Sequence, residues 1–141
     1  MAVILVSACL LGCPTRYDGK SVPSEKVLAL AADNVLIPVC PEQLGGLTTP
    51  RKPSERQPDG ETLLMNDGTD VTENYRRGVD ITLKIAELDR IDYAILKSCS
   101  PSCGKGLIYD GTFSGRKIPG SGVTAEALMN AGYTVYSEED L

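Results

Sequence analysis

Short apolar runs end next to cysteines throughout this 141-residue chain. Four of the five cysteines show this arrangement: Cys9 follows residues 2–6, Cys40 follows residues 35–39, and Cys99 and Cys103 follow residues 93–96. Such runs are typical of buried strands in a parallel sheet. In an open α/β sheet the carboxyl ends of the strands face one crevice, where such folds bind ligands. We therefore expect thiols that are far apart in the sequence to meet at one edge of a sheet.

Strand patterns alternate with helical patterns along the chain. Strands are expected at residues 3–6, 35–39, 61–65, 93–96 and 134–136, and helices at residues 24–32 and 71–88 and between Thr124 and Gly132. The longest helix has one apolar face, made by Val71, Tyr75, Val79, Leu83 and Ala86. Residues 107–118 predict a turn or short hairpin, and the proline-rich residues 41–60 an irregular segment. This alternation predicts a compact, Rossmann-like three-layer α/β fold with a mostly parallel sheet, in one domain over residues 1–141.

The charge balance and the absence of histidine argue against several functions. The chain has 14 Lys and Arg residues against 19 Asp and Glu residues, and its net charge of -5 disfavours a general nucleic-acid or anionic-membrane surface. The apolar start lacks a basic flank and is too short to span a bilayer, so we expect a first strand and a cytoplasmic protein with no membrane partner. Without histidine, this chain alone cannot perform Ser-His-Asp or Cys-His catalysis or bind a metal through imidazole.

Three cysteines stand in settings that suit an inorganic ligand: Cys9 in SACLLG, Cys40 in PVCPE and Cys103 in SCSPSCG. Proline or glycine near a thiol lets a bulky group approach, although these residues also punctuate ordinary turns. Three thiolates from three loops suit an iron-sulfur cluster or a thiolate-rich zinc site. Taken singly, each cysteine also fits the role of a small buried apolar residue. The odd number of cysteines and the βα pattern disfavour a disulfide framework.

Seven motifs follow one another along almost the whole chain: SACLLG, RYDGK, PVCPEQLGGLTTPR, GTDVT, ILKSCSPSCG, GLIYDGTFSG and GVTAE. In these motifs the sequence resembles the bacterial thiouracil desulfidase domain family. The resemblance implies a compact α/β fold and a 4Fe-4S cluster that is bound by only three cysteines. It also implies non-redox removal of sulfur from a thiolated uracil.

The resemblance assigns roles to single residues. The three cluster ligands correspond to Cys9, Cys40 and Cys103. Glu42 corresponds to a carboxylate that acts as catalytic acid and base, and Ser100 and Ser102 correspond to serines that line the same pocket, where we expect catalytic roles. Cys13 and Cys99 stand where the family pattern does not require a thiol. Both are expected to be accessory, although either would close the metal site if it became a fourth ligand.

The implied mechanism is hydrolytic. The soft thiocarbonyl sulfur would bind the unligated iron, which acts as a Lewis acid, and water deprotonated by Glu42 would attack the ring carbon. Sulfur would leave as sulfide, without electron transfer. Arg51, Glu55 and Lys97 are candidates for the rim of the site. The expected substrate is a thiolated base or nucleoside, with thiolated tRNA less favoured by the acidic charge balance; the ring position and the oligomeric state are left open.

Two other functions remain open from the residues themselves. The first is a non-catalytic module in which the thiolates bind zinc or a fully ligated cluster. The second is a cluster-free thiol-redox protein that uses either Cys99 with Cys103 or Cys9 with Cys13. Iron, sulfide and zinc analysis after anaerobic purification distinguishes all three functions.

Overall fold

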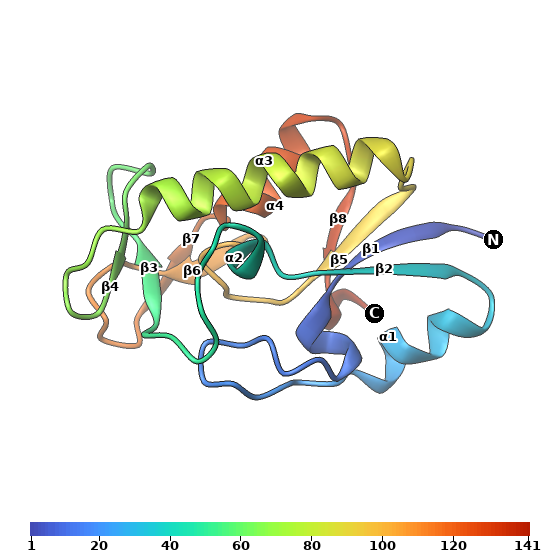
Figure 1. The fold of residues 1–141 in the computed structure, drawn as a ribbon, viewed down its shortest axis with the longest axis horizontal. Helices are drawn as coiled ribbons and strands as arrows, with labels where there is room; N and C mark the ends of the chain where they lie inside the picture. Colours follow the sequence, from blue (N-terminus) through green and yellow to red (C-terminus); the bar gives the residue numbers. More distant parts are fainter.

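Four parallel strands form the central sheet of the computed structural model, which describes residues 1–141 (Figure 1). The strands are β1 (Val3–Ser7), β2 (Val35–Val39), β5 (Tyr93–Leu96) and β8 (Val135–Ser137). They lie in the order β2-β1-β5-β8, and each neighbouring pair is parallel. The carboxyl ends of all four strands therefore share one edge of the sheet.

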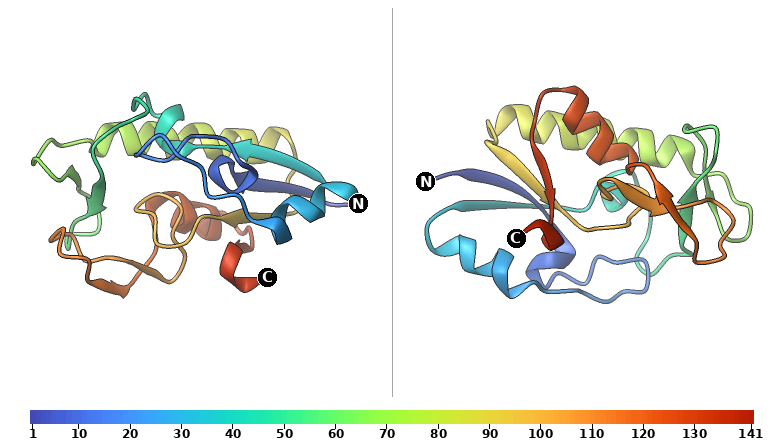
Figure 2. Two further views of the ribbon diagram at one scale, coloured as in Figure 1. Left: turned by 90° about the horizontal axis from the view of Figure 1, so that it is seen from below. Right: turned by 180° about the vertical axis from the view of Figure 1, so that it is seen from behind.

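Helices cover both faces of this sheet (Figure 2). They are α1 (Glu25–Ala29), which continues as a 3₁₀ turn over Leu30–Ala32, α3 (Thr72–Leu88) and α4 (Val123–Asn130). Because side chains alternate along a strand, Leu5 faces α3 and α4, whereas Ile4 and Val6 face α1. The prediction of a three-layer α/β fold with a mostly parallel sheet is confirmed. None of the helices combines the length and the hydropathy that a membrane span requires.

A short helix and two antiparallel hairpins lie outside the central sheet. They are α2 (Pro41–Leu44), β3 (Ser54–Arg56) paired with β4 (Leu63–Met65), and β6 (Leu107–Tyr109) paired with β7 (Lys117–Pro119). The hairpin predicted within residues 107–118 is confirmed. The prediction of an irregular segment over residues 41–60 is wrong at α2 and β3. Pro41 begins α2 because the first helical position does not need an N–H group, and β3 depends on its partner β4, which local propensity does not reveal.

The buried face of α3 differs from the apolar stripe that the sequence predicts. Its buried residues are Tyr75, Gly78, Thr82 and Ala86. Val79 and Leu83 of the predicted stripe are only partly buried. Thr82 tolerates burial because its hydroxyl donates a hydrogen bond to the Gly78 carbonyl, at 2.7 Å. The buried face of α3 contains Gly78 because α2 packs closely against it.

Two glycines allow α2 to approach the backbone of α3. A Cβ atom on Gly45 would collide with the carbonyl oxygen of Asn74, and one on Gly78 would collide with the carbonyl oxygen of Pro41. The Asn74 side chain adds a hydrogen bond to the Gly45 carbonyl, at 2.9 Å. Since α2 follows Cys40 directly and contains Glu42, this close contact positions two of the predicted site residues.

The close contact predicts that Gly78→Ala destabilises the protein. In an exposed helix this change would stabilise by up to about 1 kcal/mol. Here the added methyl group meets a backbone carbonyl, and overpacking typically costs about 1–3 kcal/mol, so we expect a net loss of about 1–2 kcal/mol. Chemical denaturation measures the free energy of unfolding. Lys84→Ala, at an exposed position of the same helix, is the control and should change stability by less than about 0.5 kcal/mol. A Gly78→Ala variant as stable as wild type would contradict the contact.

Candidate active site

A cavity of about 450 Å³ opens at the carboxyl edge of the central sheet. Its walls come from the segments that follow β1, β2 and β5, together with the turn between β6 and β7. This volume lies within the usual range of small-molecule sites, about 300–1,000 Å³. Four cysteines line the cavity: Cys9, Cys40, Cys99 and Cys103. Cys13 is not part of the lining, so the structure brings together the three predicted ligands and one of the two predicted accessory thiols.

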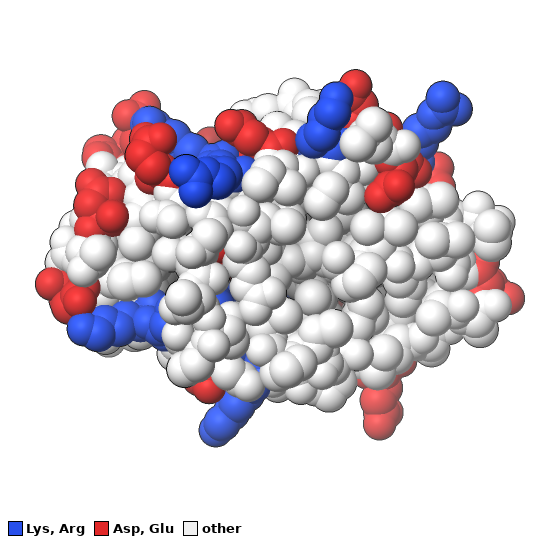
Figure 3. All heavy atoms as spheres, in the orientation of Figure 1, with Lys and Arg blue, Asp and Glu red and all other residues white.

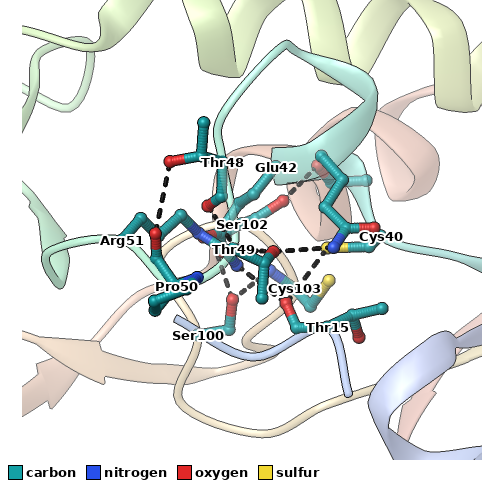
Figure 4. Close-up of polar contacts among 12 residues, drawn as sticks. Thr15, Cys40, Glu42, Thr48, Thr49, Pro50, Arg51, Ser100, Ser102 and Cys103 are labelled. Carbon is teal, nitrogen blue, oxygen red and sulfur yellow. Dashed lines mark hydrogen bonds and ion pairs between the residues drawn. The ribbon is translucent and has the colours of Figure 1, made fainter. Parts of the chain in front are cut away.

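The three predicted ligands reach the cavity from different segments. Cys9 lies in a 3₁₀ helix over Ala8–Leu11 that directly follows β1. Cys40 stands between β2 and α2, and its thiol donates a hydrogen bond to the Thr15 carbonyl, at 3.7 Å (Figure 4). Cys103 lies in the loop after β5 and is buried. All five cysteines of the chain are free thiols.

Burial raises the pKa of all three thiols. The pKa of Cys9 is raised to about 11 and that of Cys103 to about 12, and the pKa of Cys40 is raised as well. The ammonium group of Lys97 opposes this rise at Cys9, and the hydroxyl of Ser7 opposes it at Cys103. These thiols are therefore protonated at neutral pH, and a metal group must displace their protons in order to bind.

The donor set fits an iron-sulfur cluster. The thiols are close enough to interact electrostatically, since Cys40 acts on the pKa of both Cys9 and Cys103. No three Cys, Asp or Glu side chains approach closely enough to bind a single metal ion. The thiolates of a cluster bind different iron atoms, so they do not have to meet at one point. Three free thiols on the walls of one cavity thus match the donors that such a cluster requires.

Glu42 lines the same cavity, two residues beyond Cys40. Its Oε2 atom accepts a hydrogen bond from Nε of Arg51, at 2.9 Å (Figure 4). Both side chains are largely buried, and a buried charge is strongly unfavourable unless it has a partner. The ion pair therefore holds the Glu42 side chain in the cavity wall.

Arg51 connects two loops around the site. Its side chain is only 5% exposed, so the structure places it in the wall rather than at the outer rim. Its guanidinium group donates hydrogen bonds to the Thr48 carbonyl, the Thr49 hydroxyl and the Thr15 carbonyl, at 3.2, 2.9 and 3.1 Å (Figure 4). Its backbone N–H donates to the Tyr17 carbonyl, at 2.8 Å. Arg51 thereby fixes Glu42 and the loop that contacts Cys40 in one arrangement.

The two predicted catalytic serines have different surroundings. Ser100 lines the cavity, and its oxygen accepts hydrogen bonds from the backbone N–H groups of Ser102 and Cys103, at 3.1 and 3.0 Å. Its hydroxyl proton remains available for donation. Ser102 is 1% exposed and its hydroxyl lies 2.7 Å from that of Thr124, at the start of α4. The expectation that Ser102 lines the pocket is wrong, because α4 packs on this residue and engages its hydroxyl.

Glu138 supports the loop that carries Cys103, a role that sequence analysis missed. Its carboxylate lies 3.2 Å from the ammonium group of Lys97 and accepts a hydrogen bond from the backbone N–H of Ser98, at 2.7 Å. Lys97 and Ser98 line the cavity, as the rim prediction for Lys97 anticipated. Glu138 directly follows β8, and only the pairing of β8 with β5 brings it here. No local sequence signal identifies it.

Tyr75 of α3 is a second neighbour of the site that the sequence did not reveal. Its hydroxyl is buried and has no hydrogen-bond partner. Burial raises the pKa of Tyr75 well above its usual value, and the negative charge of Glu42 raises it further. The hydroxyl therefore stays neutral and lies next to a carboxylate of the cavity wall.

Charged side chains of both signs are interspersed on the face of the molecule that Figure 3 shows. They gather along α3, at the upper edge of this view, where Glu73 and Arg76 form an exposed ion pair with a separation of 2.7 Å. The middle of this face is uncharged. The visible face thus has no broad surface of one sign.

Comparisons with known proteins agree with this site. A family model for 2-thiouracil desulfurase matches residues 4–140. The solved structure of a 4Fe-4S-dependent thiouracil desulfidase, TudS, is 45% identical and has a TM-score of 0.93, with 100% of this chain and 93% of that chain covered. The uncharacterized protein YbbK of Bacillus subtilis (strain 168) is 48% identical, with 99% of this chain and 97% of YbbK covered. The resemblance found in the motifs is confirmed: the chain belongs to the 2-thiouracil desulfurase family.

Proposed function

We propose that this protein is an iron-sulfur-dependent desulfidase that converts a thiolated pyrimidine to the oxo base and releases sulfide. The observation that carries the proposal is the cavity at the sheet edge, which is lined by three free thiols and by the largely buried side chain of Glu42. The family and the structural similarity to TudS support this function over a non-catalytic metal module or a thiol-redox protein. Overall, the thiocarbonyl group and water give the carbonyl group and hydrogen sulfide, so no electron donor or acceptor is needed.

The proposed cluster ligands are Cys9, Cys40 and Cys103. When bound by three protein ligands, a 4Fe-4S cluster supplies an iron with an open coordination position, which is a Lewis acid suited to a soft thiocarbonyl sulfur. Cys99 lines the cavity as well and is the one thiol outside this set that is placed to close the fourth position. Cys13 lies outside the cavity lining, which supports an accessory role.

The chain itself provides the groups for proton transfer. Glu42 is proposed as the base that removes a proton from the attacking water, and Arg51 holds its carboxylate toward the cavity. The hydroxyl of Ser100 has its acceptor sites engaged by backbone N–H groups, so it is oriented to donate a hydrogen bond to the substrate. No catalytic role is proposed for Ser102, because its hydroxyl is engaged by Thr124.

The form of the substrate remains a prediction. The cavity volume suits a free base or nucleoside, and the net charge of -5 disfavours thiolated tRNA. A cytoplasmic location is also still a prediction, and the five free thiols agree with a reducing compartment.

The proposed ligand set predicts different effects for the five cysteines. Replacing Cys9, Cys40 or Cys103 by Ser should abolish cluster binding, whereas Cys13→Ser and Cys99→Ser should retain it. Iron and acid-labile sulfide, measured after anaerobic reconstitution, should be about four each per chain in the wild type and in the two control variants. Loss of iron from Cys99→Ser alone would mean that the cluster is closed by a fourth ligand. One zinc per chain in place of iron would contradict the proposed cofactor.

If Glu42 is the base, the Glu42→Gln variant should bind the cluster but convert the substrate slowly. Gln keeps a carbonyl oxygen for Arg51 but cannot take a proton, so the single-turnover rate with 2-thiouracil should fall by roughly 10²- to 10⁴-fold. Iron content and unfolding temperature are measured in parallel, because Glu42 is a partner of a buried charge. Glu61→Gln, in an exposed turn, is the matched control and should react like wild type. An unchanged rate in the loaded Glu42→Gln protein would show that another group activates water.

A further inference from the structure

The turn between β6 and β7 forms a wall of the cavity without any part in the proposed proton transfer. Tyr109 and Phe113 from this hairpin line the cavity. Phe113 is the only phenylalanine in the chain. Its φ angle is 57°, in the left-handed region that residues other than glycine rarely adopt. Such backbone strain persists only where surrounding contacts enforce it, and it gathers at ligand sites. The contacts that enforce this conformation of Phe113 therefore help to define its role in the cavity.

Glu55 of β3 enforces the conformation of the turn. It is only 9% exposed, and its Oε1 atom accepts hydrogen bonds from the backbone N–H groups of Gly111 and Phe113, at 2.9 and 3.2 Å. Gln57 donates from its side chain to the Gly111 carbonyl, at 3.2 Å. One buried carboxylate oxygen thus accepts hydrogen bonds from the backbone N–H groups of Gly111 and Phe113, which fixes the backbone from which the Phe113 side chain extends relative to β3.

A second set of bonds stiffens the same turn from within. The Asp110 carboxylate accepts hydrogen bonds from the backbone N–H and the hydroxyl of Thr112, at 3.0 and 2.6 Å. The Thr112 hydroxyl also lies 2.6 Å from that of Ser114. The segment that presents Phe113 to the cavity is therefore fixed before any ligand arrives, as a binding wall requires.

We propose that Phe113 is the wall on which the planar pyrimidine ring stacks, and that Glu55 is the positioning residue that holds this wall in place. The inference rests on the proposed function of the cavity and adds the recognition of the ring to it. An aromatic face binds a heteroaromatic ring by stacking and by exclusion of water, with little dependence on ring substituents. Phe113 should therefore contribute to the binding of substrate and of the sulfur-free product uracil alike.

Binding of uracil and turnover of 2-thiouracil by the cluster-loaded protein test the wall. Phe113→Ala should weaken uracil binding and raise KM by roughly 5- to 100-fold, the usual effect of removing a stacking side chain, with a smaller change in kcat and an unchanged iron content. Phe113→Tyr keeps the ring and should stay within about twofold of wild type. Tyr136→Ala removes an aromatic side chain that does not line the cavity, and it should bind uracil like wild type.

The role of Glu55 is tested by a double-mutant cycle. Glu55→Ala frees the turn, so it should raise KM about as much as Phe113→Ala, and the double variant should be no worse than either single variant. Additive effects would show that Glu55 acts independently of Phe113. Unchanged uracil binding and an unchanged KM in Phe113→Ala would overturn the proposed stacking role of Phe113. Loss of the cluster from Phe113→Ala would overturn it as well, because the side chain would then be needed for cluster binding. If the wild-type protein neither binds uracil nor converts 2-thiouracil, the proposed function itself is wrong, and the stacking role of Phe113 falls with it.

Discussion

The parallel pairing of β1 with both β2 and β5 is the constraint on which the site depends. Ser7, the last residue of β1, pairs with Val39, the last residue of β2, and Val6 pairs with Ile95 near the end of β5. The three strands thus end at the same level, and the segments with Cys9, Cys40 and Cys103 all begin at one edge. An antiparallel pair at either position would send one thiol to the opposite edge, and the cavity would lose a wall.

Around this edge the protein combines negative ligands with cations that are held firmly. Cluster binding would turn three thiols into thiolates beside Glu42, and several negative charges in one partly buried space are unfavourable unless cations lie nearby. Arg51 is bound to Glu42 and to two loops, and Lys97 is bound to Glu138 and opposes the rise in the pKa of Cys9 that burial causes. The close contact of α2 with α3 completes this frame, because it sets the distance of Glu42 from the sheet.

The sequence predicts those parts of the site that depend on residues close together along the chain. Apolar runs indicate the strands, and Cys9, Cys40 and Glu42 stand directly beside strand ends, so their meeting in one cavity follows from topology. The burial of Arg51, the contact of Ser102 with Thr124 and the support from Glu138 depend on packing between distant segments, which no short pattern encodes. The short helix α2 escaped prediction for the same reason, since it relies on glycines that accept another backbone.

The source of the oxygen atom that replaces sulfur tests hydrolytic desulfuration most directly. The cluster-loaded protein is incubated anaerobically with 2-thiouracil in ¹⁸O-labelled water, without an electron donor or acceptor, and the uracil is analysed by mass spectrometry. Hydrolysis predicts that each uracil formed carries a single ¹⁸O atom and that an equal amount of sulfide is released. Unlabelled uracil, a requirement for an oxidant or reductant, or no conversion by the loaded protein would contradict this mechanism.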